Sequence, residues 1–280
     1  MKINRIHGLS EYINYQDKTA LGYAAHLAYL ALILPKHDGN FTVRGYSYVA
    51  EKEVDFLCDF KCSSGYPHVN WRERVVCPIT AFNNRMRAAI WFFDVFSNSY
   101  PDSPIYIMEQ TTPVYRYLKD RYINLVGSEY LGDDVPFGEI DERGVRNEDA
   151  TALSFNDKTL DTILSFDVFE HIYDYRLAFA ECSRVLKENG CMIFTVPFST
   201  DSTNNIERAV LLDNGEINHL LPPEYHGDPL SSGGILCYRH YGWRMLEDLV
   251  NAGFKEAFAT IINSVPMGHY TNQLIFFAKK

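Results

Sequence analysis

The sequence predicts an α/β fold built on a doubly wound, mostly parallel sheet. Three observations lead to this prediction: strand and helix patterns alternate over residues 105–198, the strand candidates are continuously apolar, and two more strand candidates end the chain. Continuously apolar strands separated by helices are typical of a parallel sheet covered on both faces. The last two strands are expected to form an antiparallel edge pair, and residues 1–96 a small α+β accessory region.

The accessory region opens with a helical pattern that continues to about residue 36. Apolar residues recur at helical spacing from Ala20 to Leu34, and Pro35 ends the pattern. The stretch is too short to span a bilayer, so we expect a helix that is buried or faces a partner. Three β-like runs and a second helix complete the region, at residues 41–43, 46–49, 54–57 and 83–96.

Three cysteines of this region have a spacing similar to that of a degenerate zinc ribbon. Cys58 and Cys62 are separated by three residues, and Cys77 begins a Cys-Pro-Ile-Thr sequence that lacks a final cysteine. A structural zinc site needs four ligands, and His68 is the candidate for the missing one. Alternatively, the cysteines pack as small apolar side chains. Both alternatives stay open, and no residue is assigned as a metal ligand.

Residues 97–280 are expected to form the main domain. Its first five strand candidates are residues 105–108, 123–126, 143–146, 159–166 and 191–196. A helix over 175–187 should end at a left-handed cap at Asn189-Gly190. An insertion at about 199–242 contains a hairpin turned at Asn214-Gly215. A helix over 243–252 and strands at 258–262 and 273–278 close the fold.

An acidic residue follows each of four strand candidates, namely Glu109, Glu129, Asp149 and Asp167. Ligands of an open parallel sheet bind outside the carboxyl ends of its strands. The interval of about twenty residues between Glu109 and Glu129 is the one that places a carboxylate on a ribose diol. Any one of these acids could instead cap a helix. The four together favour a ligand site.

The turn after the first of these strands argues against a cofactor that carries phosphate. It reads Glu-Gln-Thr-Thr-Pro over residues 109–113, with no glycine and no basic residue. A pyrophosphate site needs close backbone approach at a helix N-terminus, which glycine allows. S-adenosylmethionine has no phosphate and carries a sulfonium cation, which carboxylates suit.

Three segments carry a family resemblance: Glu-Asp-Ala-Thr-Ala-Leu-Ser-Phe at 148–155, Phe-Asp-Val-Phe-Glu-His at 166–171, and Arg-Val-Leu-Lys-Glu-Asn-Gly at 184–190. They resemble the later motifs of class I S-adenosylmethionine-dependent methyltransferases of the type 11 kind. The clear match covers about residues 149–198, and a weaker match extends from 105 to the C-terminus. The resemblance implies a Rossmann-like fold, S-adenosylmethionine as cofactor and methyl transfer as the reaction.

The resemblance also implies roles for individual residues. Glu109 would lie at the motif I acid position near the methionine moiety, and Glu129 would hold the ribose hydroxyls. Asp149 with Ala150 would meet the adenine, and Asp167 would line the pocket floor. Motif I is degenerate here, because Thr111 and its two successors stand where the family has glycines.

Three histidines, His171, His226 and His240, are candidates for a catalytic general base, because the imidazole pKa suits proton transfer near neutral pH, and the role is assigned to His171 and His226. His171 directly follows the fourth strand, at the edge where cofactor and acceptor would meet, although it could also be a packing residue. His226 and Asp228 lie in a turn-rich segment, residues 222–236, which is either an acceptor-binding loop or an ordinary ordered loop.

The charge balance limits the partners. Lys+Arg 26 against Asp+Glu 36 gives a net charge of −10, which repels nucleic acid and anionic membrane surfaces. Without a recognisable signal peptide, the six cysteines are expected to be free thiols in the cytoplasm. We therefore expect methyl transfer to a small-molecule acceptor, such as a sugar or glycan precursor. The alternative is a non-catalytic methyltransferase-fold scaffold, and a homodimer is one expectation for the oligomeric state.

Overall fold

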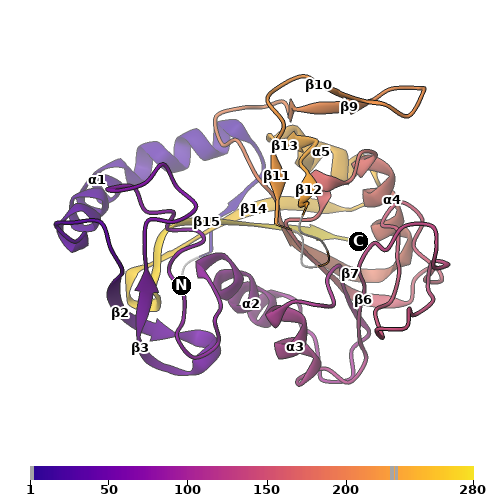
Figure 1. Cartoon of the computed structure of the whole chain (residues 1–280), viewed down its shortest axis with the longest axis horizontal. Coiled ribbons are helices and arrows are strands. Elements are labelled where there is room, and N and C mark those ends of the chain that lie inside the picture. The colour runs from indigo at the N-terminus through magenta and orange to yellow at the C-terminus, as the bar shows by residue number, and fades with distance from the viewer. Residues whose placement is uncertain (1–2, 228–229, 231–232) are drawn as a thin grey trace. The chain divides into compact units, whose positions relative to one another are not determined.

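The computed structural model describes residues 3–227, 230 and 233–280 (Figure 1). The chain forms two compact units. Unit 1 contains Ser10–Asn98, Ala259–Ile275 and the start of the chain up to Ile6, and unit 2 contains His7–Leu9, Ser99–Phe258 and Phe276–Lys280. The expected division into 1–96 and 97–280 differs from this partition, because residues 259–275 group with unit 1 instead of with the main domain.

Unit 1 contains two helices and a two-stranded hairpin. Helix α1 (Leu9–Ile33) ends two residues before Pro35, and α2 (Asn84–Phe96) begins where the Asn83 side chain accepts a hydrogen bond from the Met86 amide. Strands β2 (Phe41–Ser47) and β3 (Lys52–Cys58) pair antiparallel along their whole length. The three β-like runs thus merge into two strands, joined by the 3₁₀ turn η1 (Tyr48–Ala50).

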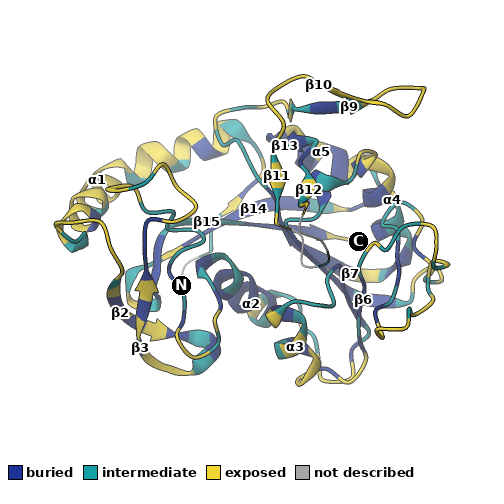
Figure 2. Cartoon of the chain, viewed as in Figure 1, coloured by how far each residue is buried: buried dark blue, intermediate teal, exposed yellow. Residues whose placement is uncertain are grey.

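Helix α1 is not buried within the chain. Its buried residues are Tyr12 and Leu30, whereas Leu21 and Leu32 are 91% and 83% exposed. Figure 2 shows α1 exposed over most of its length. The first of the two expectations for this helix, burial, is therefore wrong. The second expectation, that the helix faces a partner, stays a prediction. No helix in the described part of the chain is both long and apolar enough to cross a membrane.

The three N-terminal cysteines lie in different environments. Cys58 and Cys77 are buried in an apolar cluster with Phe56, Val75 and other residues, while Cys62 is exposed. Burial raises the pKa of Cys58 to about 12, which keeps it a thiol. Within the described residues, no group of three potential metal ligands includes these cysteines or His68. The packing alternative accounts for Cys58 and Cys77.

The main sheet has the order β1-β14-β15-β7-β6-β4-β5. Its strands are β1 (Arg5–Ile6), β4 (Ile105–Ile107), β5 (Leu125–Gly127), β6 (Leu160–Phe166), β7 (Leu186–Thr195), β14 (Glu256–Ser264) and β15 (His269–Lys279). The block β7-β6-β4-β5 is parallel, and β15 pairs with β7 antiparallel. The predicted fold class, a mostly parallel Rossmann-like sheet with a C-terminal antiparallel addition, is confirmed.

Three local predictions differ from this sheet. Residues 143–146 form no strand and make only isolated bridges, Ile140 to Arg146 and Glu129 to Asn147. The C-terminal pair is not at the edge, because β1 pairs with the outer side of β14. Asn189 is left-handed, with φ 69°, but it lies inside β7 and does not cap the preceding helix.

The helices of unit 2 are α3 (Pro113–Lys119), α4 (Tyr175–Val185) and α5 (Arg244–Asn251). Between β7 and α5, the insertion forms short strands: β8 (Ile206–Glu207), β9 (Ala209–Leu211), β10 (Ile217–His219), β11 (Tyr225–His226), β12 (Ile235–Leu236) and β13 (Arg239–His240). The predicted hairpin is β9–β10, and Gly215 at φ 83° makes its turn. The 3₁₀ turns η2 (Phe169–His171) and η3 (Val265–Met267) follow β6 and β14.

Candidate active site

A pocket of about 890 Å³ opens within unit 2 at the carboxyl ends of β4, β5 and β6. This is the edge where parallel α/β sheets bind their ligands. The pocket brings together most of the residues predicted from the sequence: Glu109, Glu129, Asp149, Ala150, Asp167 and His171. Thr111 does not line it, but the next residue, Thr112, does.

Thr111 instead holds Glu129 in place. Its amide and hydroxyl donate hydrogen bonds to Glu129 Oε1 at 2.9 and 2.8 Å, and the Gln110 amide donates a third at 2.8 Å. The carboxylate at the end of β5 therefore fixes the loop that follows β4. Oε2 is the oxygen of Glu129 that these three bonds leave for a ligand.

Gly127 has no side chain, so the loop that follows β4 can pack closely against the end of β5. That loop itself contains no glycine. A Cβ added at Gly127 would lie 2.5 Å from Cε2 of Tyr115 and 2.7 Å from the Glu109 carbonyl oxygen. Any side chain at residue 127 would displace the backbone at Glu109. Gly127 was not predicted as a site residue, although a glycine directly after the strand candidate 123–126 was a visible signal.

The third acidic position combines a turn cap with the pocket wall. Asp149 Oδ1 accepts hydrogen bonds from the amide and hydroxyl of Thr151, both at 2.7 Å, which closes a turn; no helix begins here, so the alternative expectation of a helix cap is wrong for Asp149. Beside it, the buried Glu148 accepts hydrogen bonds from Arg146 at 2.8 Å and from Ser154 at 2.6 Å. These bonds fix the conformation of residues 148–154, which follow the residues, 143–146, that were predicted to form a strand.

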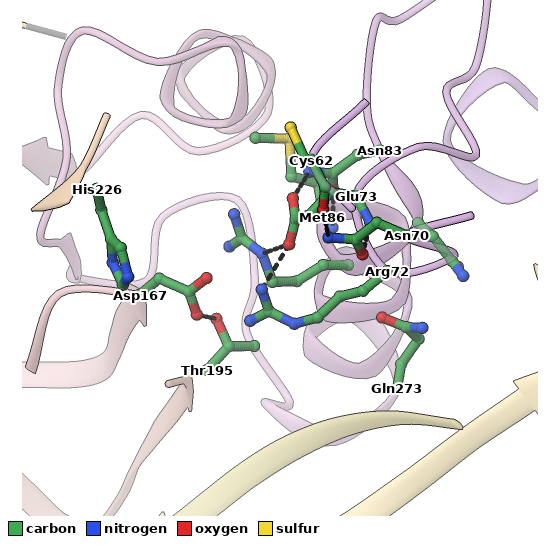
Figure 3. A network of polar contacts seen from close by, with 12 residues as sticks. Cys62, Asn70, Arg72, Glu73, Asn83, Met86, Asp167, Thr195, His226 and Gln273 are labelled. Atoms are coloured by element: carbon green, nitrogen blue, oxygen red, sulfur yellow. Dashed lines mark hydrogen bonds and ion pairs between the residues drawn. The ribbon is translucent and has the colours of Figure 1, made fainter. Parts of the chain in front are cut away.

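Asp167, directly after β6, has a left-handed backbone with φ 58°. Its Oδ1 accepts a hydrogen bond of 2.7 Å from the hydroxyl of Thr195, the last residue of β7 (Figure 3). Asp tolerates this conformation better than most residues, but the conformation still carries strain. Strained backbone that faces a pocket is common at functional sites.

The two predicted histidines meet at one side of the pocket. His171 Nε2 lies 3.2 Å from His226 Nδ1, and the buried Glu170 carboxylate lies within 3.7 Å of both rings. The other nitrogen of each ring is hydrogen-bonded: His171 Nδ1 to the Leu236 carbonyl, and His226 Nε2 to Glu224. Glu170 and Glu224 were not predicted as site residues, although each is within two positions of a candidate histidine. Asp228 lies outside the described residues.

The environment of this cluster separates the two histidines chemically. Burial raises the pKa of Glu170. Contact with the Glu170 carboxylate is the main reason that the pKa of His226 rises to about 9. An imidazole with that pKa is protonated at neutral pH and cannot accept a proton, so His171 suits the general-base role better than His226.

The comparisons with known proteins agree with the motifs. A family model described as a methyltransferase domain matches residues 114–194. The chain is 31% identical over 83 residues to glycine/sarcosine/dimethylglycine N-methyltransferase of Actinopolyspora halophila. That alignment covers 30% of this chain but only 15% of the relative.

Two solved structures illustrate the structural similarity. An S-adenosylmethionine-dependent methyltransferase from Mesorhizobium loti is 13% identical with a TM-score of 0.41, covering 69% of this chain and 98% of that one. The 1,6-didemethyltoxoflavin-N1-methyltransferase of Burkholderia thailandensis is 14% identical with a TM-score of 0.39, covering 70% and 78%.

The family match starts one residue after the turn at 109–113 and runs almost to the end of β7. It includes α3, β5, β6 and α4 and three of the four predicted strand-end acids. The predicted resemblance to methyltransferases is therefore confirmed over residues 114–194.

Proposed function

We propose that this chain transfers a methyl group from S-adenosylmethionine to a small-molecule acceptor. The observation that carries the proposal is the row of carboxylates, Glu109, Glu129, Asp149 and Asp167, around one pocket at the carboxyl ends of parallel strands. The basic residue in its lining, Arg143, is paired with Asp141 at 2.7 Å. Such a lining favours a sulfonium cation over a pyrophosphate.

The proposed cofactor contacts follow the strand ends. Glu109 would meet the methionine moiety, and Glu129 would accept the ribose hydroxyls through Oε2. Asp149 and Ala150 would face the adenine, and Asp167 would close the floor. Thr111 acts through Glu129 as a positioning residue, since its hydrogen bonds are made to that carboxylate.

The reaction is an in-line displacement at the methyl carbon. The acceptor atom forms a bond to that carbon, the carbon–sulfur bond breaks with its electron pair left on sulfur, and S-adenosylhomocysteine is released. Catalysis rests mainly on positioning and on removing water from the nucleophile. For a hydroxyl acceptor, such as the sugar or glycan precursor that we propose, His171 would accept the displaced proton.

A calorimetric titration tests the proposal. We expect saturable binding of S-adenosylmethionine and S-adenosylhomocysteine, and no saturable binding of NAD or ATP in the same concentration range. A folded sample that binds neither adenosyl ligand at millimolar concentration would contradict methyl transfer and favour a scaffold. Release of S-adenosylhomocysteine in the presence of a panel of sugars and nucleotide sugars then tests the acceptor class.

We further propose that the chain is a cytoplasmic homodimer. All six cysteines are free, as suits a reducing compartment. No charged side chain occurs between Lys18 and Lys36, so the exposed face of α1 suits an equally uncharged partner, which a second copy provides. Light scattering should give twice the chain mass, and Leu21→Glu together with Leu32→Glu should reduce it to one. A wild-type monomer at high concentration contradicts this.

A further inference from the structure

We propose that Glu170, His171 and His226 form a binding site for a divalent first-row transition-metal ion. His171 Nε2 and His226 Nδ1 are 3.2 Å apart, and Glu170 Oε1 lies 3.7 Å from the first and 3.4 Å from the second. Ligand atoms about 2.1 Å from one ion lie about 3.0 to 3.4 Å from each other in octahedral or tetrahedral geometry. The three side chains thus need only small shifts to share an ion.

Once an ion displaces the proton of His226 Nδ1, the hydrogen bonds of the two rings direct a lone pair of each toward the same point. The Leu236 carbonyl can only accept, so His171 Nδ1 donates to it at 2.8 Å and Nε2 is left with its lone pair. His226 Nε2 bonds to the Glu224 carboxylate at 3.0 Å, which leaves Nδ1 facing Glu170. Ligating histidines are held in this way by a carbonyl or carboxylate on the other nitrogen.

The burial of the Glu170 carboxylate is a separate reason to expect a cation at this position. The residue is 0% exposed, and among the described residues its carboxylate makes no short hydrogen bond: its contacts are the long ones from Oε1 to His226 Nδ1 at 3.4 Å and to His171 Nε2 at 3.7 Å. A buried carboxylate is strongly destabilising unless a cation faces it. Three acceptor atoms within 3.7 Å of one another therefore surround a position for a cation. The competing occupant is a proton on His226.

A neighbouring group, Glu224, His226 and Cys237, is the weaker candidate. Glu224 already bonds to His240 at 3.0 Å and pairs with Arg208 at 3.2 Å, and the Cys237 thiol donates to the Arg239 carbonyl. Those atoms make short contacts with other protein groups, whereas the contacts of Glu170 Oε1 among the described residues are the longer ones to the two histidines, at 3.4 and 3.7 Å.

The donor set indicates the class of ion. Two imidazole nitrogens and one carboxylate oxygen suit zinc, manganese, iron or cobalt, and do not suit calcium or magnesium, which prefer oxygen ligands. Three protein ligands leave coordination positions open. Because His171 also lines the pocket, an acceptor oxygen could reach such a position; while the ion is bound, His171 Nε2 holds the ion and does not serve as the proton acceptor.

The test uses the full chain, freed of metal by a chelator and dialysed. We expect calorimetry to give one equivalent of Zn²⁺ or Mn²⁺ per chain, with magnesium at least 100-fold weaker, and Co²⁺ to give visible absorption bands. Glu170→Gln and His171→Gln should each weaken zinc binding by at least 100-fold. The matched controls, Cys237→Ser and His240→Gln, should change it less than threefold.

Two results would overturn the proposal. One is no binding of these ions at 1 mM by wild-type protein that circular dichroism shows to be folded. The other is loss of binding in Cys237→Ser with retention in Glu170→Gln, which would assign the ion to the neighbouring group. If Glu170→Gln fails to fold, His171→Gln decides the question alone. The readout is independent of S-adenosylmethionine, so it is separate from the test of methyl transfer.

Discussion

Thr111 donates two hydrogen bonds, from its amide at 2.9 Å and its hydroxyl at 2.8 Å, to one oxygen of Glu129. The two residues belong to the ends of adjacent parallel strands, β4 and β5. A loop that lacks glycines is thereby held by a carboxylate from the neighbouring strand. Glu129 has two roles in the proposed site, since Oε1 orders the loop and Oε2 would accept the ribose hydroxyls.

Substitution of Glu129 should separate these roles. Glu129→Gln keeps an acceptor for the loop but loses the charge, so we expect S-adenosylmethionine affinity to fall by about 1 to 2 kcal/mol. Glu129→Ala removes both functions and should lower affinity further. Calorimetric titration measures both variants, with Thr111→Val as the control that loses only one bond to the loop. Unchanged affinity in Glu129→Ala would mean that the ribose lies elsewhere.

Substitution of Gly127 should disturb the proposed cofactor site indirectly, by displacing the backbone at Glu109. The new methyl group in Gly127→Ala would meet the Glu109 carbonyl at 2.7 Å, and backbone there can move only by shifting the loop. We expect a loss of about 1 to 3 kcal/mol in unfolding free energy and weaker binding of S-adenosylhomocysteine. Gly8→Ala, where the added Cβ meets nothing within 4 Å, is the matched control. Equal behaviour of the two variants in urea unfolding and calorimetry would contradict the prediction.

The left-handed backbone at Asp167 should limit which amino acids this position tolerates. Asp167→Ala places a β-carbon without a local hydrogen bond at φ 58° and loses the bond from Thr195, so we expect a destabilisation of about 1 to 3 kcal/mol. In Asp167→Asn the side chain still offers a hydrogen-bond acceptor, and the residue still tolerates this backbone conformation. The loss of unfolding free energy should therefore be less than half of that in Asp167→Ala. Urea unfolding of both variants and of Thr195→Val checks this. If Asp167→Asn were less stable than Asp167→Ala, the argument from backbone strain would be wrong.

His269 should make the chain sensitive to acid. It is 1% exposed and donates to Asn84 Oδ1, and burial, followed by the charge of Arg87, lowers its pKa to about 3. In the unfolded chain its pKa is about 6.5. Between these values only the unfolded state binds the proton, so stability is lost as the pH falls from about 6.5 toward 3, by up to about 1.4 kcal/mol per pH unit.

The variant His269→Gln can still donate to Asn84 but cannot titrate. Its unfolding free energy, measured in urea at pH 7, 6, 5 and 4, should therefore decline less steeply than that of the wild type. His37→Gln, which changes an exposed histidine, should follow the wild-type slope. Parallel curves for His269→Gln and wild type would show that His269 takes up no proton on unfolding.

The alternation of apolar strands with helices was sufficient to predict the sheet and the edge at which its acids meet. The carboxyl ends of parallel strands coincide, so acids such as Glu109 and Asp167, read off locally, had to gather there. Residues 143–146 were predicted as a strand because their local pattern cannot show whether a pairing partner exists, and only isolated bridges form.

The sequence by itself determined the α/β class, the row of acids and the nearness of His171 to the pocket. Only the tertiary structure decided that Thr111 serves Glu129, that Gly127 makes room for Glu109, and that β1 lies outside β14. It also brought His226 to Glu170 and His171 from 55 residues away in the chain. Local periodicity reports which face of an element is buried, whereas such contacts depend on long-range pairing and on the path of the insertion, which no local pattern encodes.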